Sequence, residues 1–224
     1  MAEVIAELDP ARVKENLGAV REEIAAAARR AGRHPADVEL VAAVKYVSVE
    51  AMGALAEAGV GVVGENRAQD LAAKADRWPG AFVWDFIGAL QSRKVKEVLP
   101  YVRWIHSLAS DSALRQLERH GTPKTEVLVE VNVAGEEGKA GIAPAELPAF
   151  LERCPVKVVG LMTMPPFAED PERSRRHFAA LREVAEARGL AHLSMGTTQD
   201  FAVAVEEGAT VVRIGSRLYD GAQG

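Results

Sequence analysis

The chain has 224 residues, of which 48% are hydrophobic and 26% are charged, a composition typical of a soluble globular protein. Lys and Arg number 27 against 32 Asp and Glu, and the resulting net charge of −5 argues against a surface for nucleic acid. No apolar run approaches the roughly 18 residues of a membrane span. The single cysteine, Cys154, cannot form an intramolecular disulfide, and no secretory signal is recognisable, so we expect a cytoplasmic protein.

The first predicted element is an amphipathic helix over Pro10–Ala31. Its apolar residues recur at a spacing of three or four from Val13 to Ala28. Asp9 is placed to cap its beginning and Gly32 to end it. We therefore assign residues 1–35 to an additional N-terminal helix and residues 38–224 to one barrel domain.

Short β-rich runs then alternate with helical patterns. Eight runs predict strands: Leu40–Val47, Gly61–Gly64, Phe82–Gly88, Val102–Ser107, Val127–Val133, Val156–Met164, His192–Gly196 and Thr210–Gly215. This alternation predicts parallel strands joined by right-handed crossovers. An open doubly wound sheet is the alternative, but eight units that use the whole chain favour a closed (β/α)8 TIM barrel, whose bottom or side the N-terminal helix would cover.

Lys45 lies in the first and most apolar of these runs, near its carboxyl end. Burial in such a strand disfavours the charged ammonium, so we expect a lowered pKa and a free amine able to attack a carbonyl. Active sites of this barrel lie at the carboxyl ends of the strands. A lysine whose stem packs on the strand while its amine reaches water is the alternative.

Small and hydroxyl-bearing residues follow the last two predicted strands. Such loops leave backbone N–H groups and hydroxyls free to bind an anion, and the corresponding loops form the recurrent phosphate site of this barrel. A purely structural role, with Thr198 capping the last helix, is the alternative. The residues in question are Ser194, Gly196, Thr197 and Thr198 in the first loop, and Gly215 and Ser216 in the second.

Closure of the barrel would bring the lysine and this predicted phosphate site together, because the eighth strand then lies beside the first. A ligand joining them spans roughly 5 to 10 Å, which suits the aldehyde and phosphate of pyridoxal 5′-phosphate (PLP) but also a sugar phosphate. Arg213 favours PLP, since a guanidinium facing the ring nitrogen would keep the pyridine unprotonated and weaken it as an electron sink. An arginine paired with a surface carboxylate is the alternative.

Other residues are expected at the same face of the barrel. Asn66 could bind a ring hydroxyl and Met162 could pack on the ring, although turn or core roles suit both equally well. His106 could handle a proton, but a lone histidine is more often a satisfied structural group. No pattern of His and Cys predicts a metal site.

The chain resembles the pyridoxal phosphate homeostasis proteins over nearly its whole length. Seven ordered segments carry the resemblance: V-A-A-V-K ending at Lys45, G-E-N-R-A-Q-D from Gly64, W-D-F-I-G-A-L-Q-S-R-K from Trp84, V-N-V-A-G-E-E-G-K-A-G from Val131, G-L-M-T-M from Gly160, L-S-M-G from Leu193 and V-R-I-G-S from Val212.

The resemblance implies a fold-type III PLP-binding barrel, like the N-terminal domain of alanine racemase, with a Schiff base on Lys45. It also implies phosphate contacts from Thr198, Gly215 and Ser216, and Arg213 opposite the ring nitrogen. The chain departs from the family pattern at Ala89, Arg93, Thr197-Thr198 and the segment after Ser216. By the family pattern Thr198 keeps the hydroxyl and Thr197 contributes only through its backbone, whereas the roles of Ala89, Arg93 and the segment after Ser216 stay open.

Three functions remain open at this point. We favour a protein that binds PLP and acts in its intracellular homeostasis and delivery to PLP-dependent apoenzymes, as a monomer or weak homodimer, with no assured catalytic residue. An amino-acid racemase is the second, but it needs an opposed acid or base that 224 residues do not obviously supply. A cofactor-free Schiff-base aldolase is the third, and it predicts a colourless protein.

Overall fold

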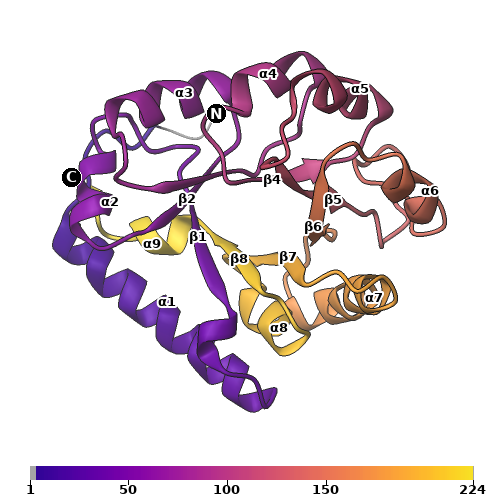
Figure 1. The fold of residues 1–224 in the computed structure, drawn as a ribbon. Coiled ribbons are helices and arrows are strands. Elements are labelled where there is room, and N and C mark those ends of the chain that lie inside the picture. Colours follow the sequence, from indigo (N-terminus) through magenta and orange to yellow (C-terminus); the bar gives the residue numbers. More distant parts are fainter. Residues whose placement is uncertain (1–3, 224) are drawn as a thin grey trace.

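A computed structural model describes residues 4–223, and in it eight parallel strands form a closed barrel in chain order, with β8 beside β1 (Figure 1). The predicted (β/α)8 barrel is therefore confirmed. The strands are β1 (Glu39–Ala43), β2 (Val62–Glu65), β3 (Val83–Phe86), β4 (Trp104–Leu108), β5 (Glu126–Glu130), β6 (Lys157–Met162), β7 (His192–Thr197) and β8 (Val211–Ile214).

Helices cover the outside of the barrel and connect successive strands (Figure 1). The α-helices are α1 (Pro10–Arg30), α2 (Met52–Glu57), α3 (Ala68–Arg77), α4 (Val95–Val98), α5 (Asp111–His120), α6 (Leu147–Glu152), α7 (Arg175–Glu186), α8 (Phe201–Glu206) and α9 (Ser216–Tyr219). Short 3-10 turns precede three elements: η1 (Pro35–Asp37), η2 (Ser92–Lys94) and η3 (Pro171–Ser174).

The period of two along each strand separates the barrel interior from the layer under the helices. On β1, Val41 belongs to a small interior cluster with Trp104, Leu128 and Met162, whereas Ala42 belongs to the large core beneath the helices. By the same alternation, the residue that follows Val41 and Ala43 on the interior side is Lys45, which lines the cavity at the carboxyl ends of the strands.

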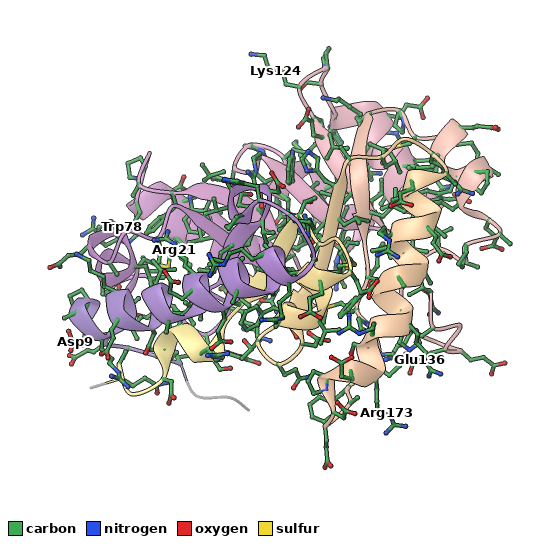
Figure 2. All side chains as sticks on the ribbon, turned by 90° about the horizontal axis from the view of Figure 1, so that it is seen from below. Asp9, Arg21, Trp78, Lys124, Glu136 and Arg173 are labelled. Atoms are coloured by element: carbon green, nitrogen blue, oxygen red, sulfur yellow. The ribbon has the colours of Figure 1, made fainter. Side chains whose placement is uncertain are left out.

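The N-terminal helix α1 lies on the side of the barrel, against α8, α9 and α2 (Figure 1). The Asp9 side chain, labelled at the start of α1 in Figure 2, accepts the N–H of Ala11 at 2.9 Å, as the sequence predicts for an N-cap. Gly32 follows the helix with a φ of +68°, a conformation that favours glycine.

The first strand is shorter than predicted, because β1 ends at Ala43. After Val44, the chain pairs with the N-terminal segment: Ile5 donates its N–H to the carbonyl of Tyr46 at 2.7 Å, and Ser48 donates to the carbonyl of Ile5 at 2.9 Å. Lys45 consequently lies two residues beyond the strand, and its side chain is exposed. The expectation that strand burial desolvates this lysine is therefore wrong for this structure.

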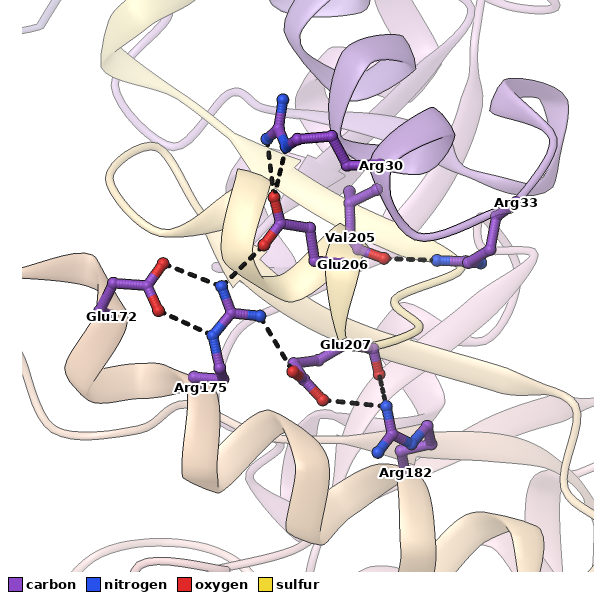
Figure 3. A network of polar contacts seen from close by, with 8 residues as sticks. All are labelled: Arg30, Arg33, Glu172, Arg175, Arg182, Val205, Glu206 and Glu207. Carbon is purple, nitrogen blue, oxygen red and sulfur yellow. Dashed lines mark hydrogen bonds and ion pairs between the residues drawn. The ribbon is translucent and has the colours of Figure 1, made fainter.

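A network of ion pairs joins α1, α7 and α8 on the outside of the barrel (Figure 3). Arg175 contacts Glu172, Glu206 and Glu207 at 2.7 to 3.0 Å, and Glu206 also accepts from Arg30 at 2.7 Å. The Arg175 hydrogen bond holds the pKa of Glu206 below its ordinary value. The paired carboxylate thus stabilises the fold above the pKa of the unfolded chain and loses this effect as the pH falls.

We expect Glu206→Gln to lower the free energy of unfolding by about 1 kcal/mol at low ionic strength, because it breaks contacts in a network rather than in one isolated pair. The loss should shrink in about 1 M salt, where screening acts over only ~3 Å. Glu15→Gln is the matched control, since its partner Arg12 is an exposed neighbour on α1. Urea denaturation measures both variants, and equal losses for the two would contradict the role of the network.

None of the helices between residues 4 and 223 has the length and apolar character that crossing a bilayer demands. Within the same range, no three His, Cys, Asp or Glu side chains gather as a metal site requires.

Candidate cofactor site

A cavity of about 780 Å³ opens at the carboxyl ends of the strands. It brings together residues from both ends of the chain, because β8 closes against β1. Of the residues singled out from the sequence, those that line it are Lys45, Asn66, Thr197, Thr198, Arg213, Gly215 and Ser216. Ser194 and Met162 do not line it, and their positions are described below.

Two buried groups hold the backbone that carries Lys45. Lys74, on α3, donates from its Nζ to the carbonyl of Val44 at 2.8 Å, and the hydroxyl of Tyr219 donates to the carbonyl of Ala43 at 3.0 Å. The Nζ of Lys45 itself lies 4.9 Å from the centre of the Tyr46 ring. The exposed amine is thus attached to a stretch of backbone that two buried donors hold in place.

The loop after β7 presents Thr198 to the loop after β8. Gly196 precedes it with a φ of +89°, and a Cβ there would lie 2.5 Å from the Cβ of Ala204, so only glycine fits this turn. The Thr198 hydroxyl oxygen accepts the N–H of Gly215 at 3.1 Å, which leaves its own hydrogen free to donate into the cavity. Ser216 begins α9, and its N–H has no partner within that helix.

Thr197 lines the cavity, but its donors point elsewhere. Its N–H donates to the Asp200 carboxylate at 2.7 Å, and its hydroxyl donates to the same oxygen at 3.2 Å. The predicted contribution of Thr197 to an anion site is therefore not available in this arrangement. From the sequence, Asp200 is given no role, although a short acidic side chain often accepts a hydrogen bond from a nearby backbone N–H in a turn.

Arg213 points its guanidinium into the barrel below the cavity mouth and is almost fully buried. Nη1 donates to the hydroxyl of Ser194, and Nη2 donates to the carbonyl of Thr163 at 3.1 Å and to the sulfur of Met164 at 2.9 Å. Burial lowers the pKa of Arg213 to about 10, against the opposing charges of Glu130 and Asp200. The guanidinium thus remains a cation at neutral pH.

Ser194 and Met162 lie beneath the cavity rather than in its wall. The side chain of Ser194 is fully buried between Arg213 and His106, and Met162 packs in the interior cluster with Val41. From the sequence, both are expected at this end of the barrel. Which side chain reaches the cavity depends on the alternation along the strands and on the register shifts in the β5–β6 and β7–β8 pairings. Met164, two residues beyond Met162, lines the cavity instead.

Asn66 carries an acceptor without a partner. Its Oδ1 is buried and forms no hydrogen bond among the described residues. The backbone of Gly88 packs directly against the backbone of Asn66, since a Cβ on Gly88 would lie 2.2 Å from the main-chain carbonyl oxygen of Asn66. A hydroxyl donor in the cavity would satisfy this atom.

A second, smaller cavity of about 470 Å³ adjoins the first and shares Asn66 with it. Ala89 and Arg93, two of the positions that depart from the family pattern, line this second cavity together with Arg67 and Lys94.

The side chains of the larger cavity match the functional groups of PLP. The Lys45 amine suits an aldehyde, the Thr198–Gly215–Ser216 turns suit a phosphate, and the unpartnered Oδ1 of Asn66 suits a ring hydroxyl. Arg213 supplies N–H donors that a pyridine nitrogen can accept. The donor set and the one unpartnered acceptor therefore fit this cofactor.

Comparisons with known proteins agree with this assignment. The sequence profile of the family described as alanine racemase, N-terminal domain, matches residues 16–223. A pyridoxal phosphate homeostasis protein of Aquifex aeolicus is 41% identical over 219 residues, which cover 92% of this chain and 96% of the relative. A protein of the same name from Pseudomonas aeruginosa is 37% identical over 92% of this chain and 94% of its own.

Among solved structures, PipY of Synechococcus elongatus with PLP bound superposes with a TM-score of 0.76 at 28% identity, covering 92% of this chain and 99% of that chain. A solved structure described as an unknown protein from Bifidobacterium adolescentis has a TM-score of 0.86 at 31% identity, covering 97% of this chain and 100% of that chain. The resemblance stated from the sequence is thereby confirmed: this chain belongs to the family of pyridoxal phosphate homeostasis proteins, within the alanine racemase N-terminal domain group.

Proposed function

We propose that this protein binds PLP in the larger cavity, holds it covalently through the Nζ of Lys45, and serves intracellular PLP homeostasis without robust catalysis of its own. One observation carries the proposal: a single cavity combines an amine, an anion-binding pair of turns and a buried guanidinium. The names of the relatives and the PLP bound to PipY support it.

Each group in the cavity has one task. When bound, PLP would supply an aldehyde group, which can condense with an amine with release of water. Lys45 provides that amine, and the fixed carbonyls of Ala43 and Val44 keep its backbone in place. Thr198 and the N–H groups at the start of α9 bind the phosphate, while Arg213 donates to the ring nitrogen.

Arg213 suits a carrier or a racemase-like site better than a transaminase, and our preference for a carrier rests on the family and on the lack of a recognisable opposed acid or base in the sequence. A guanidinium donates a hydrogen bond to the ring nitrogen without protonating it, so the ring withdraws electrons less strongly than a protonated pyridinium. Such a ring stabilises a carbanion less than a protonated pyridinium would. We further propose that the protein works in the cytoplasm, as a monomer or weak homodimer, and passes PLP to apoenzymes.

Two measurements on the purified protein test this function. Titration of the PLP-free protein with PLP should produce an absorbance band that saturates at one PLP per chain. Incubation of the loaded protein with single-enantiomer alanine should give racemisation well below roughly 1 per second, the lower end of ordinary enzymatic rates.

Sustained racemisation at or above that rate would establish the racemase alternative instead. A protein that stays colourless with PLP, yet is trapped by borohydride with a sugar phosphate, would establish the aldolase alternative.

A further inference from the structure

A single file of hydrogen bonds crosses the barrel interior beneath the cavity. It starts at Arg213 on β8, passes through Ser194 on β7 and His106 on β4, and reaches Asp85 on β3. The four residues lie on four of the eight strands of the closed barrel (Figure 1). Barrels of this fold usually fill their interior with branched apolar side chains, so a polar layer at this position calls for a reason.

The members of the file are all buried. His106, Ser194 and Asp85 have no solvent-exposed surface, and Arg213 retains only 5%. His106 Nδ1 lies 2.8 Å from the Ser194 oxygen, and His106 Nε2 lies 3.2 Å from the Asp85 carboxylate. Because these groups are removed from bulk solvent, their donors and acceptors must match one another.

The direction of each hydrogen bond follows from its two ends. Arg213 can only donate, so the Ser194 oxygen accepts from it, and the Ser194 hydrogen is then directed to His106 Nδ1. Ionised Asp85 can only accept, so His106 Nε2 carries the proton. Only the neutral imidazole with its proton on Nε2 satisfies every group in the file.

Charged groups around the file agree with this state. Burial lowers the pKa of His106, the Asp85 carboxylate opposes that effect, and the nearby guanidinium groups of Arg213 and Arg103 add to it. Burial alone would raise the pKa of Asp85, but the hydrogen bonds from His106 and Arg103 outweigh it and keep the pKa below the ordinary value. Arg103 in turn is paired with Glu39 at the opposite end of the barrel.

We propose that Ser194 and His106 are positioning residues: as a neutral Nε2–H imidazole held by Asp85, His106 orients the Ser194 hydroxyl, and Ser194 fixes the Arg213 guanidinium that faces the cofactor ring. This inference rests on the proposed binding of PLP in the cavity. It assigns to the buried polar layer the task of aiming one donor, a task that apolar packing cannot perform.

A double-mutant cycle tests the proposal by the affinity for PLP. His106→Phe and Ser194→Ala should each weaken PLP binding about tenfold, since a displaced donor loses roughly one hydrogen bond to the ring. In an Arg213→Gln background, the same substitutions should cause no further loss, because no guanidinium remains to be aimed. Ser174→Ala, at an equally buried serine outside the file, is the matched control and should leave the affinity unchanged.

Losses that are as large in the Arg213→Gln background as in the parent protein would overturn the positioning role. A parent protein that fails to bind PLP would instead overturn the proposed function, so the two failures are distinguishable.

A measurement on the unsubstituted, PLP-free protein tests the protonation state of His106 directly, and it remains possible if the variants of the buried residues do not fold. Nitrogen-15 chemical shifts of the histidine rings, assigned to His106 by comparison with His106→Gln, should show a neutral ring protonated on Nε2 at neutral pH. A ring protonated on Nδ1, or an imidazolium, would overturn the proposed file, because either state would leave a buried donor or acceptor mismatched.

Discussion

Replacing Lys74 by methionine is expected to lower the free energy of unfolding by about 3–5 kcal/mol, because it leaves a buried carboxylate without its counter-charge. Lys74 Nζ lies 3.1 Å from Glu65 Oε2, and the two side chains are 4% and 0% exposed. The other oxygen of Glu65 already lacks a partner among the described residues. Urea denaturation monitored by circular dichroism measures the loss.

The pH dependence of this variant follows from Glu65. Burial raises the pKa of Glu65, and the Lys74 ammonium opposes that rise. A carboxyl group whose pKa is raised by folding destabilises the folded state once the pH exceeds the pKa of the unfolded chain. This destabilisation disappears when the group is protonated in both states at lower pH. The difference between Lys74→Met and the parent protein should therefore shrink as the pH falls from about 8 to about 5.

The double variant Lys74→Met/Glu65→Leu is the control, since replacing both partners by apolar residues of similar size should recover much of the stability. A single variant within about 1 kcal/mol of the parent protein, or a double variant no better than the single one, would contradict the importance of the buried pair.

Replacing Lys45 by alanine is expected to weaken PLP binding at least ~100-fold, equivalent to about 2.7 kcal/mol, and to abolish the absorbance of the covalent complex. Lys45 is the only lysine among the described residues that line the cavity, so no neighbour can take over its amine. Equilibrium titration followed by absorbance measures both effects.

Two further variants separate covalent attachment from charge. Lys45→Arg keeps a cation near the phosphate but has no nucleophilic amine, so it should also lose the absorbance band. Lys96→Ala removes an exposed lysine from α4 and should leave the affinity unchanged. Retention of the band in Lys45→Ala would contradict the assigned attachment point.

The barrel could be predicted from the sequence because its signal is repeated. Eight apolar runs separated by helical patterns leave few topologies, and the observed strand bounds differ from the predicted ones by a few residues at most. Because a closed barrel places β8 beside β1, the sequence alone predicts that Lys45 lies near the loops after β7 and β8. The site as a neighbourhood was therefore predictable.

The details that could not be predicted depend on contacts between distant segments. β1 ends early because Ile5 pairs with Tyr46, a contact that no periodicity reveals. Helix α9 has only four residues, too few to show a helical pattern. Tyr219, at its end, therefore escaped notice although it holds the Ala43 carbonyl.

The buried file of side chains was invisible for another reason. Asp85, His106 and Ser194 lie on three separate strands, where each alone resembles an ordinary polar residue at a strand position. Their relation exists only after the barrel has closed and side-chain alternation has turned all three inward. His106 was noted from the sequence as a candidate proton handler, whereas the geometry favours a fixed, neutral ring.

The most direct test of the proposed function is borohydride reduction of the PLP-loaded protein, followed by proteolysis and peptide mass analysis. A reduced pyridoxyl group, stable to digestion, should be found on the peptide that contains Lys45. Its position on any other lysine, or its absence from a protein saturated with PLP, would contradict the central claim that Lys45 holds the cofactor in the cavity.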